Sequence, residues 1–160
     1  MSKIWNLPWQ ATVTAAGGDT DLWEINPADD RPVQIRMIRL GQISEVADAG
    51  EEGLRVTVKR LLATVTSGNG TAGTAENPQA SNESPGFTWE YNGTTVATAT
   101  GTTETLDEIG WLNRQSPLEI WYPEDKYAPK ARQTSALIIR LETTLADDMT
   151  FVGMVQVEEL

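Results

Sequence analysis

Apolar and polar residues alternate along several short segments of this chain, and a period of two predicts β-strands. The clearest alternating segments are residues 33–40, 54–65, 87–91, 118–122, 137–141 and 149–157. Turn-forming Gly, Asn, Asp and Pro residues separate many of them. The pattern predicts about eight to ten short strands and no amphipathic helix, which is typical of an all-β antiparallel β-sandwich with a jelly-roll-like strand order.

Two local features refine this picture. The alternation in residues 33–37 slips by one position at Ile38, which predicts a β-bulge or a strand buried on both faces. Further along, Asn92-Gly93 is a dipeptide typical of tight hairpin turns. It predicts a return strand that begins at Val96.

The chain divides into an arm and one domain. Residues 1–10 hold Trp5, Trp9 and a proline, and we interpret them as an N-terminal arm in front of a single β-sandwich domain, residues 11–160. Exposed aromatic side chains are costly, so the arm must either fold onto its own domain or dock on a neighbouring molecule.

A long loop interrupts the strand pattern in the middle of the chain. Residues 67–85 are rich in Gly, Asn, Ser, Thr and Pro. Loops of this length are uncommon in compact domains and are usually functional or disordered. We therefore expect this loop to contribute to function.

The composition narrows the chemistry that the chain can perform. Its 160 residues include no Cys and no His, which excludes disulfides, thiolate catalysis, Cys/His zinc sites and imidazole acid–base catalysis. The 23 acidic and 12 basic residues give a formal charge of −11, so the surface repels phosphate backbones and anionic membranes. No stretch is apolar enough for a signal peptide or a membrane span. We expect no nucleic acid and no membrane as partner, no cofactor, and synthesis in a cytoplasm.

Carboxylates are the remaining candidates for catalysis or metal binding. Glycosidases use two carboxylates across a cleft, but the acids here gather in turns and loop tips, where solvated charges normally lie. Asp48, Glu51 and Glu52 offer oxygen ligands to calcium, as does the segment 26–30, although neither has EF-hand spacing. We expect no enzyme, and an unliganded turn is the simpler interpretation of both acidic segments.

Much of the chain from residue 21 onwards resembles a family of phage proteins. The resemblance is carried by residues 21–33 (DLWEINPADDRPV), residues 41–55 (GQISEVADAGEEGLR), the Gly86-Phe87-Thr88 strand with its Asn-Gly-Thr-Thr turn, and residues 149–160. These segments are similar to the head decoration (capsid cement) proteins that tailed phages encode near the major capsid gene. The resemblance implies a structural virion protein, made in the host cytoplasm, that binds the major capsid protein on the outer capsid surface. It implies a homo-oligomer, with a trimer favoured, and no catalytic residue.

For this role we expect the arm and the loop at residues 67–85 to make the principal contacts between subunits. The candidate interface residues are Trp5, Trp9, Asn69, Thr71, Pro78 and Pro85. A second hypothesis is a head-fibre or tail adhesin module that binds a host glycan through exposed Trp side chains. A carboxylate enzyme is the third and weakest hypothesis.

Overall fold

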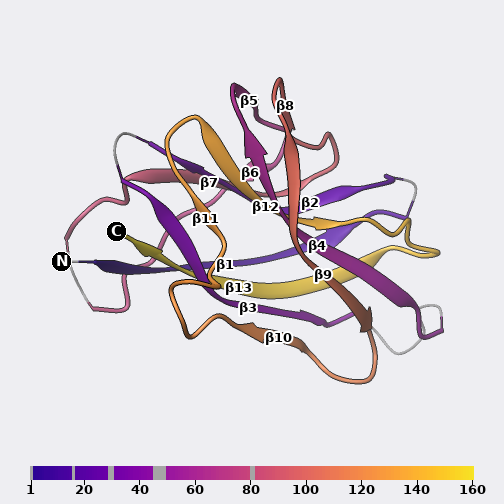
Figure 1. Ribbon diagram of the computed structural model, residues 1–160. Helices are drawn as coiled ribbons and strands as arrows, with labels where there is room; N and C mark the ends of the chain where they lie inside the picture. Colours follow the sequence, from indigo (N-terminus) through magenta and orange to yellow (C-terminus); the bar gives the residue numbers. More distant parts are fainter. Residues whose placement is uncertain (1, 16, 29–30, 45–49, 80–81) are drawn as a thin grey trace.

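The computed structural model describes residues 2–15, 17–28, 31–44, 50–79 and 82–160. Across these residues the chain forms β-strands and connections without a helix, which confirms the predicted all-β antiparallel sandwich. Two large sheets and one small two-stranded ribbon make up the fold (Figure 1).

The first sheet has five strands. Their order is β1 (Lys3–Val13), β13 (Met149–Glu159), β3 (Val33–Gln42) and β10 (Leu118–Trp121), with β11 (Lys130–Ala131) also pairing with β3. The second sheet has six strands, in the order β6 (Thr71–Ala72), β7 (Phe87–Gly93), β2 (Thr20–Pro27), β12 (Ser135–Leu141), β4 (Gly53–Leu62) and β9 (Thr103–Leu112). The ribbon joins β5 (Val65–Thr66) to β8 (Thr98–Ala99).

Eight of these strands pair from the two ends of the chain inward. β1 pairs with β13, β2 with β12, β3 with β10, and β4 with β9, and every pair is antiparallel. The chain is thus one long hairpin rolled into two sheets, which is the strand order of a jelly roll. As a result the two termini lie side by side, with Lys3 opposite Glu159 (Figure 1).

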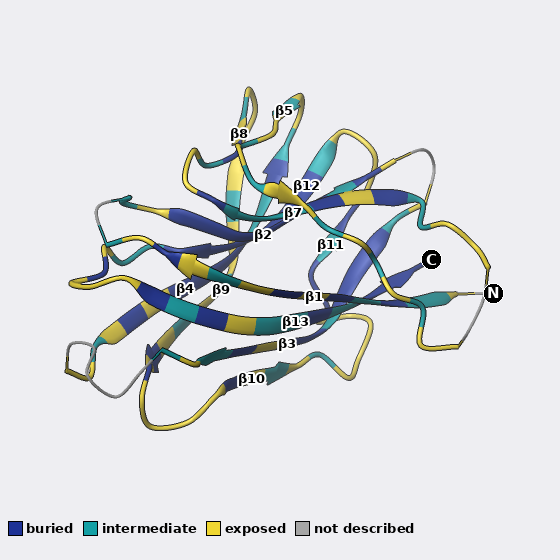
Figure 2. Cartoon of the chain, turned by 180° about the vertical axis from the view of Figure 1, so that it is seen from behind, coloured by how far each residue is buried: buried dark blue, intermediate teal, exposed yellow. Residues whose placement is uncertain are grey.

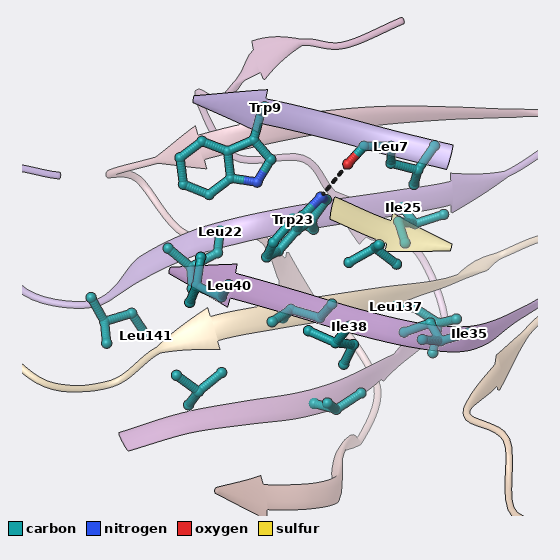
Figure 3. Close-up of a cluster of buried hydrophobic side chains, with 14 of the residues drawn as sticks. Leu7, Trp9, Leu22, Trp23, Ile25, Ile35, Ile38, Leu40, Leu137 and Leu141 are labelled. Carbon is teal, nitrogen blue, oxygen red and sulfur yellow. Dashed lines mark hydrogen bonds between the residues drawn. The ribbon is translucent and has the colours of Figure 1, made fainter. Parts of the chain in front are cut away.

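The hydrophobic core fills the space between the two sheets. Buried and exposed positions alternate along β1 and β13 (Figure 2). In β1, Trp5, Leu7 and Trp9 are all buried in the core. The Trp23 indole N–H donates to the Leu7 carbonyl at 3.0 Å, which fastens β1 to the second sheet (Figure 3).

The interpretation of residues 1–10 as an arm is therefore wrong. Residues Lys3–Val13 form an 11-residue strand, because β13 supplies backbone partners along its whole length. The side chains of Trp5, Leu7 and Trp9 stand at alternate positions and so face the same side of the sheet. That alternation is a strand signal in the sequence, although the proline between Leu7 and Trp9 obscures it.

The predicted irregularity in the strand around residue 38 is a β-bulge. Ile35 pairs with Val157 and Met37 pairs with Gln156, so Arg36 is the extra residue in β3. Beyond the bulge, Ile38 and Leu40 rejoin Ile35 in the core. One inserted residue thus explains the slip in the hydrophobic pattern.

The predicted hairpin at Asn92-Gly93 is absent. Asn92 has the positive φ of 55° that suits a turn, but residues after Gly93 do not return along β7. Both edges of β7 are already occupied, one by β2 and the other by β6. The chain continues instead to β8, which pairs with β5.

The segment between β4 and β9 closes one flank of the sandwich. It places β7 and β6 beyond β2, and it bridges to the outer edge of β1. Asn6 and Glu76 exchange two backbone hydrogen bonds of 2.8 and 2.9 Å. The residues that cap β1 therefore come from the long loop at residues 67–85.

Candidate interaction surface

The opposite flank of the sandwich is open. The two sheets end there in β9 and β10, which are consecutive along the chain and joined by residues 113–117 (Figure 1). In the part of the chain that the structure describes, no strand pairs with the outer edge of either one. We call β9, β10 and residues 122–130 the open flank. Unpaired strand edges are natural places for another chain to dock.

Exposed apolar side chains concentrate on this flank. The described residues include seven exposed large hydrophobic side chains, and four of them belong to the open flank. These four are Leu106 (37% exposed), Leu112 (44%), Trp121 (55%) and Tyr127 (66%). The flank therefore combines two unpaired edges with most of the exposed apolar side chains, a combination typical of an interaction surface.

A second β-bulge explains why Leu106 is exposed. Val58 pairs with Asp107 and Lys59 pairs with Thr105, so Leu106 is the extra residue in β9. The bulge breaks the regular alternation and leaves the Leu106 side chain more than a third exposed, in the wall of a surface cavity.

That cavity adjoins a second one. The first, of about 460 Å³, is lined by Leu106, Tyr122 and the segment 125–130. The second, of about 480 Å³, is lined by residues 130–135 and by Arg60, Leu62 and Ala63 at the end of β4. Arg60 and Lys130 line both cavities, so the two lie next to each other. We call this pair of cavities the basic groove.

Two polar links bridge the sheets at the groove. The Tyr122 hydroxyl donates to Asp107 Oδ2 at 2.6 Å, which connects the end of β10 to β9. The Arg60 guanidinium donates to the Lys130 carbonyl at 3.2 Å, which connects β4 to β11. Burial raises the pKa of Tyr122, and the hydrogen bond to Asp107 raises it further, so the phenol remains a donor at neutral pH.

Cations outnumber carboxylates among the residues that line the groove, on a protein that is strongly acidic. Its charged lining comprises four cations, Arg60, Lys126, Lys130 and Arg132, and one carboxylate, Asp125. The Asp125 carboxylate is engaged by Arg36 at 2.5 Å, which lowers the pKa of Asp125. Four of the 12 basic residues of the chain thus line these two neighbouring cavities.

Two of these cations form ion pairs within the chain, and two do not. Lys126 pairs with Glu124 at 3.0 Å, and Arg60 pairs with Glu104. Among the residues that the structure describes, no carboxylate lies within ion-pair distance of Lys130 or Arg132. The groove can therefore attract and hold an anionic group.

A third cavity lies at the turn that joins β9 to β10. It has a volume of about 370 Å³ and is lined by Gly41, Gln42, Ser44 and residues 113–117. Asn113 is buried there, and its amide donates to Gln42 Oε1 at 2.5 Å. This cavity and the one lined by Leu106 thus lie along the flank that β9 and β10 leave open.

The residues predicted as interface lie elsewhere. Trp5 and Trp9 are 1% and 5% exposed, so their side chains are part of the core and have no surface to offer a partner. The other four belong to the loop on the closed flank: Asn69, Thr71 and Pro78 are exposed, and Pro85 is half-buried. Asn69 is itself engaged in the fold, because its side-chain oxygen accepts from the Thr95 N–H at 2.7 Å. Any contact between these loop residues and another subunit remains a prediction.

The sequence did contain a signal for Trp121. Leu118, Ile120 and Tyr122 alternate as the inner face of their strand, which places Glu119 and Trp121 on the outer face. In the structure the Trp121 indole N–H donates to Glu119 Oε1 at 2.6 Å, and the ring stays exposed. An aromatic residue on the outer, polar face of a strand was therefore the sequence signal for an exposed apolar surface.

The acidic segments considered for calcium form no metal cluster in the described part of the chain, where no three Asp or Glu side chains are grouped to hold an ion. Asp48 and residues 29–30 lie outside the described residues. Glu52 accepts from the Ala146 N–H at 3.1 Å, so its carboxylate is used to hold a loop.

Comparison with known proteins identifies no relative: no family model, no curated protein and no solved structure matches the chain. Within the described residues there is no helix long and apolar enough to cross a membrane.

Proposed function

We propose that this protein is a structural virion protein that decorates the outside of a tailed-phage capsid and clamps neighbouring major capsid subunits. The observation that carries the proposal is the open flank, where two unpaired strand edges meet four exposed apolar side chains. The resemblance of residues 21–33, 41–55 and 149–160 to head decoration proteins supports the same role.

The chemistry of the open flank suits binding better than catalysis. Its cations are spread along a groove, and its half-buried phenol, Tyr122, is held as a hydrogen-bond donor by Asp107. A hydrophobic centre with a charged rim is the arrangement found at protein interfaces. On this proposal Trp121 and Leu112 supply the apolar contact, and the groove supplies the charges at its border.

The first test is decoration of heads by the purified protein. Heads of the encoding phage that lack this protein are mixed with the full chain, sedimented, and assayed for bound protein. We expect saturable binding, and we expect Trp121→Ser to weaken it about tenfold or more, because an exposed Trp at an interface centre contributes about 2 kcal/mol or more. Val152→Ser is the matched control, since Val152 is also exposed but lies on β13, away from the open flank.

Each outcome of this experiment has a clear meaning. No binding by the wild-type chain overturns the decoration role. Binding that Trp121→Ser leaves unchanged, or that Val152→Ser weakens equally, leaves decoration standing but shows that another surface mediates it.

The oligomeric state is a second, independent readout. We expect a closed homo-oligomer, with a trimer favoured, when the mass is measured by light scattering after size exclusion. A protein that stays monomeric both in solution and on heads would contradict the expected trimer.

A glycan-binding module is the alternative function, and one observation favours it. The Tyr127 and Trp121 rings are 66% and 55% exposed, and Tyr127 lines a cavity. Exposed aromatic rings beside a polar hollow are suited to stacking on sugars. Binding of the chain to immobilised host-surface polysaccharide, lost in Tyr127→Ala and retained in Val152→Ser, would support this function over decoration.

A further inference from the structure

We propose that the basic groove receives an extended, acidic segment of a partner polypeptide. This inference rests on the proposed function, because it assigns the chemistry of the partner at the open flank. It concerns Arg60, Lys126, Lys130 and Arg132 together with the apolar wall formed by Leu106 and Tyr127.

The size of the groove favours a ligand larger than a single small anion. The two cavities, of about 460 and 480 Å³, share Arg60 and Lys130 in their lining and so lie next to each other. A chain of several residues in extended conformation, at about 3.3 Å per residue, can contact both.

The charge of the groove indicates acidic side chains. The lining carries four cations against one carboxylate, whereas the whole chain carries 12 basic and 23 acidic residues. The Lys130 and Arg132 side chains have no carboxylate within ion-pair distance in the described part of the chain. They line the same cavity, and the Lys130 charge acts on Asp125 only at a distance beyond that of an ion pair, so both cations can contact a ligand.

The groove wall and its rim indicate a polypeptide. Leu106, Ala128 and Pro129 give an apolar wall that phosphate groups do not need. Past the bulge at Leu106, residues 107–112 of β9 form a regular edge with which no other strand of the described residues pairs. Within the chain, the Glu108 N–H is bound by Asp107 Oδ1 and the Leu112 carbonyl by the Gln115 N–H. Only a polypeptide can pair with such an edge by adding a strand. The formal charge of −11 also disfavours nucleic acid, whose many phosphates meet the acidic surface beyond the groove.

The experiment uses the full chain labelled with ¹⁵N and a synthetic peptide that alternates glutamate with valine and threonine. We expect the glutamate peptide to shift the amide signals of residues 103–108 and 122–132, and its affinity to fall as the salt concentration rises. A peptide of the same design with lysine in place of glutamate is the charge control. Inorganic polyphosphate and a single-stranded DNA oligonucleotide test the other anions.

Matched variants locate the site. Arg132→Glu is expected to weaken the glutamate peptide about tenfold, a difference of about 1.4 kcal/mol. Arg39→Glu reverses another exposed charge, on β3 and outside the groove, and it is expected to leave the affinity unchanged.

The proposal is overturned by absence of binding, by equal binding of the lysine peptide, by stronger binding of polyphosphate or DNA, or by equal effects of the two variants. If heads are decorated while the glutamate peptide does not bind, the groove assignment fails and the decoration role stands. If the peptide binds at the groove while heads are not decorated, the groove assignment stands and the capsid is not the partner.

Discussion

Arg140 and Asp21 form a buried ion pair between adjacent strands of the second sheet. The Arg140 guanidinium donates through Nε to Asp21 Oδ1 at 2.6 Å and through a second nitrogen to Oδ2 at 3.2 Å. Ala97, in the segment between β4 and β9, completes the arrangement: its N–H donates to Asp21 at 2.7 Å, and its carbonyl accepts from Arg140 at 3.0 Å. Burial raises the pKa of Asp21, and the contacts with Arg140 oppose that rise. The pair therefore links the segment between β4 and β9 to strands β2 and β12 of the second sheet.

Removing one partner of this pair should be costly. Arg140→Met leaves the Asp21 carboxylate buried without its cation, and we expect a loss of about 3–5 kcal/mol in the free energy of unfolding. Urea unfolding followed by Trp fluorescence measures it. Arg39→Met is the control, because the Arg39 side chain is exposed and lies 3.5 Å from Glu119, a pair expected to contribute less than about 1 kcal/mol. Equal effects of the two variants would contradict a structural role for the buried pair.

Gly153 is required by the packing of Trp23. A Cβ atom at position 153 would lie 2.5 Å from Cη2 of Trp23 and 2.8 Å from the Arg39 carbonyl oxygen. Gly153→Ala is therefore expected to destabilise the fold by about 1–3 kcal/mol, because a buried indole and a backbone group cannot both move away. Gly110→Ala, also in a strand, meets nothing within 4 Å and should change stability by less than about 1 kcal/mol. Thermal unfolding of both variants measures this difference in stability. A Gly153 variant as stable as the Gly110 variant would refute the steric argument.

Deletion of residues 1–10 should unfold the protein rather than only remove a contact. The deletion takes away most of β1 and with it Trp5, Leu7 and Trp9, three side chains of the core. Loss of a single large core side chain costs about 2–5 kcal/mol, so the loss of three is as large as the whole stability of an ordinary domain, about 5–15 kcal/mol. Circular dichroism in the near ultraviolet should show no fixed aromatic packing. A cooperatively folded deletion variant would show that β1 is dispensable.

Glu159 should make stability depend on pH. Its carboxylate is buried, which by itself raises the pKa, but hydrogen bonds from Arg31, the Gly86 N–H and the Trp5 indole outweigh this and lower it. Because the folded pKa lies below the ordinary value of 4.5, the stabilisation is present above that pH and is lost as the pH falls through the folded pKa. Unfolding free energies measured from pH 7 to pH 3 should decrease accordingly.

Glu159→Gln tests the source of this dependence. The variant is expected to lose about 1–3 kcal/mol at pH 7, because a neutral amide accepts less strongly from three donors and brings an N–H₂ group to the same site. Its stability should also fall less between pH 5 and pH 3 than that of the wild type. Glu124→Gln, an exposed carboxylate paired only with Lys126, should stay within about 0.5 kcal/mol of the wild type at pH 7. A wild-type pH profile in the Glu159 variant would assign the acid sensitivity to other carboxylates.

Much of the fold could be predicted from local sequence. Period-two alternation located strands at 33–42, 53–62, 87–93, 118–121, 135–141 and 149–159 to within a few residues. The slip at Ile38 correctly indicated a bulge, since one inserted residue in a strand shifts every later side chain to the other face. These features are readable because alternation depends only on neighbours in the chain.

The candidate site could not be predicted in the same way. Two of the six expected interface residues, Trp5 and Trp9, are in the core because β13, about 150 residues further along the chain, pairs with β1. The Asn92-Gly93 turn starts no hairpin because β2 and β6 already hold both edges of β7. In each case the outcome depends on which strand is the neighbour, and local pattern carries no information about that.

The sequence by itself thus determined an acidic, all-β chain without thiol or imidazole chemistry, because composition and alternation are local properties. Only the tertiary structure decided that one flank is capped by residues 67–85 and that the other is left open by β9 and β10. It also gathered Arg60 from one strand with Lys126, Lys130 and Arg132 from a distant loop around one groove. The physical reason is that strand pairing joins segments far apart in the chain, so the edges that remain unpaired become known only when the whole sheet has formed.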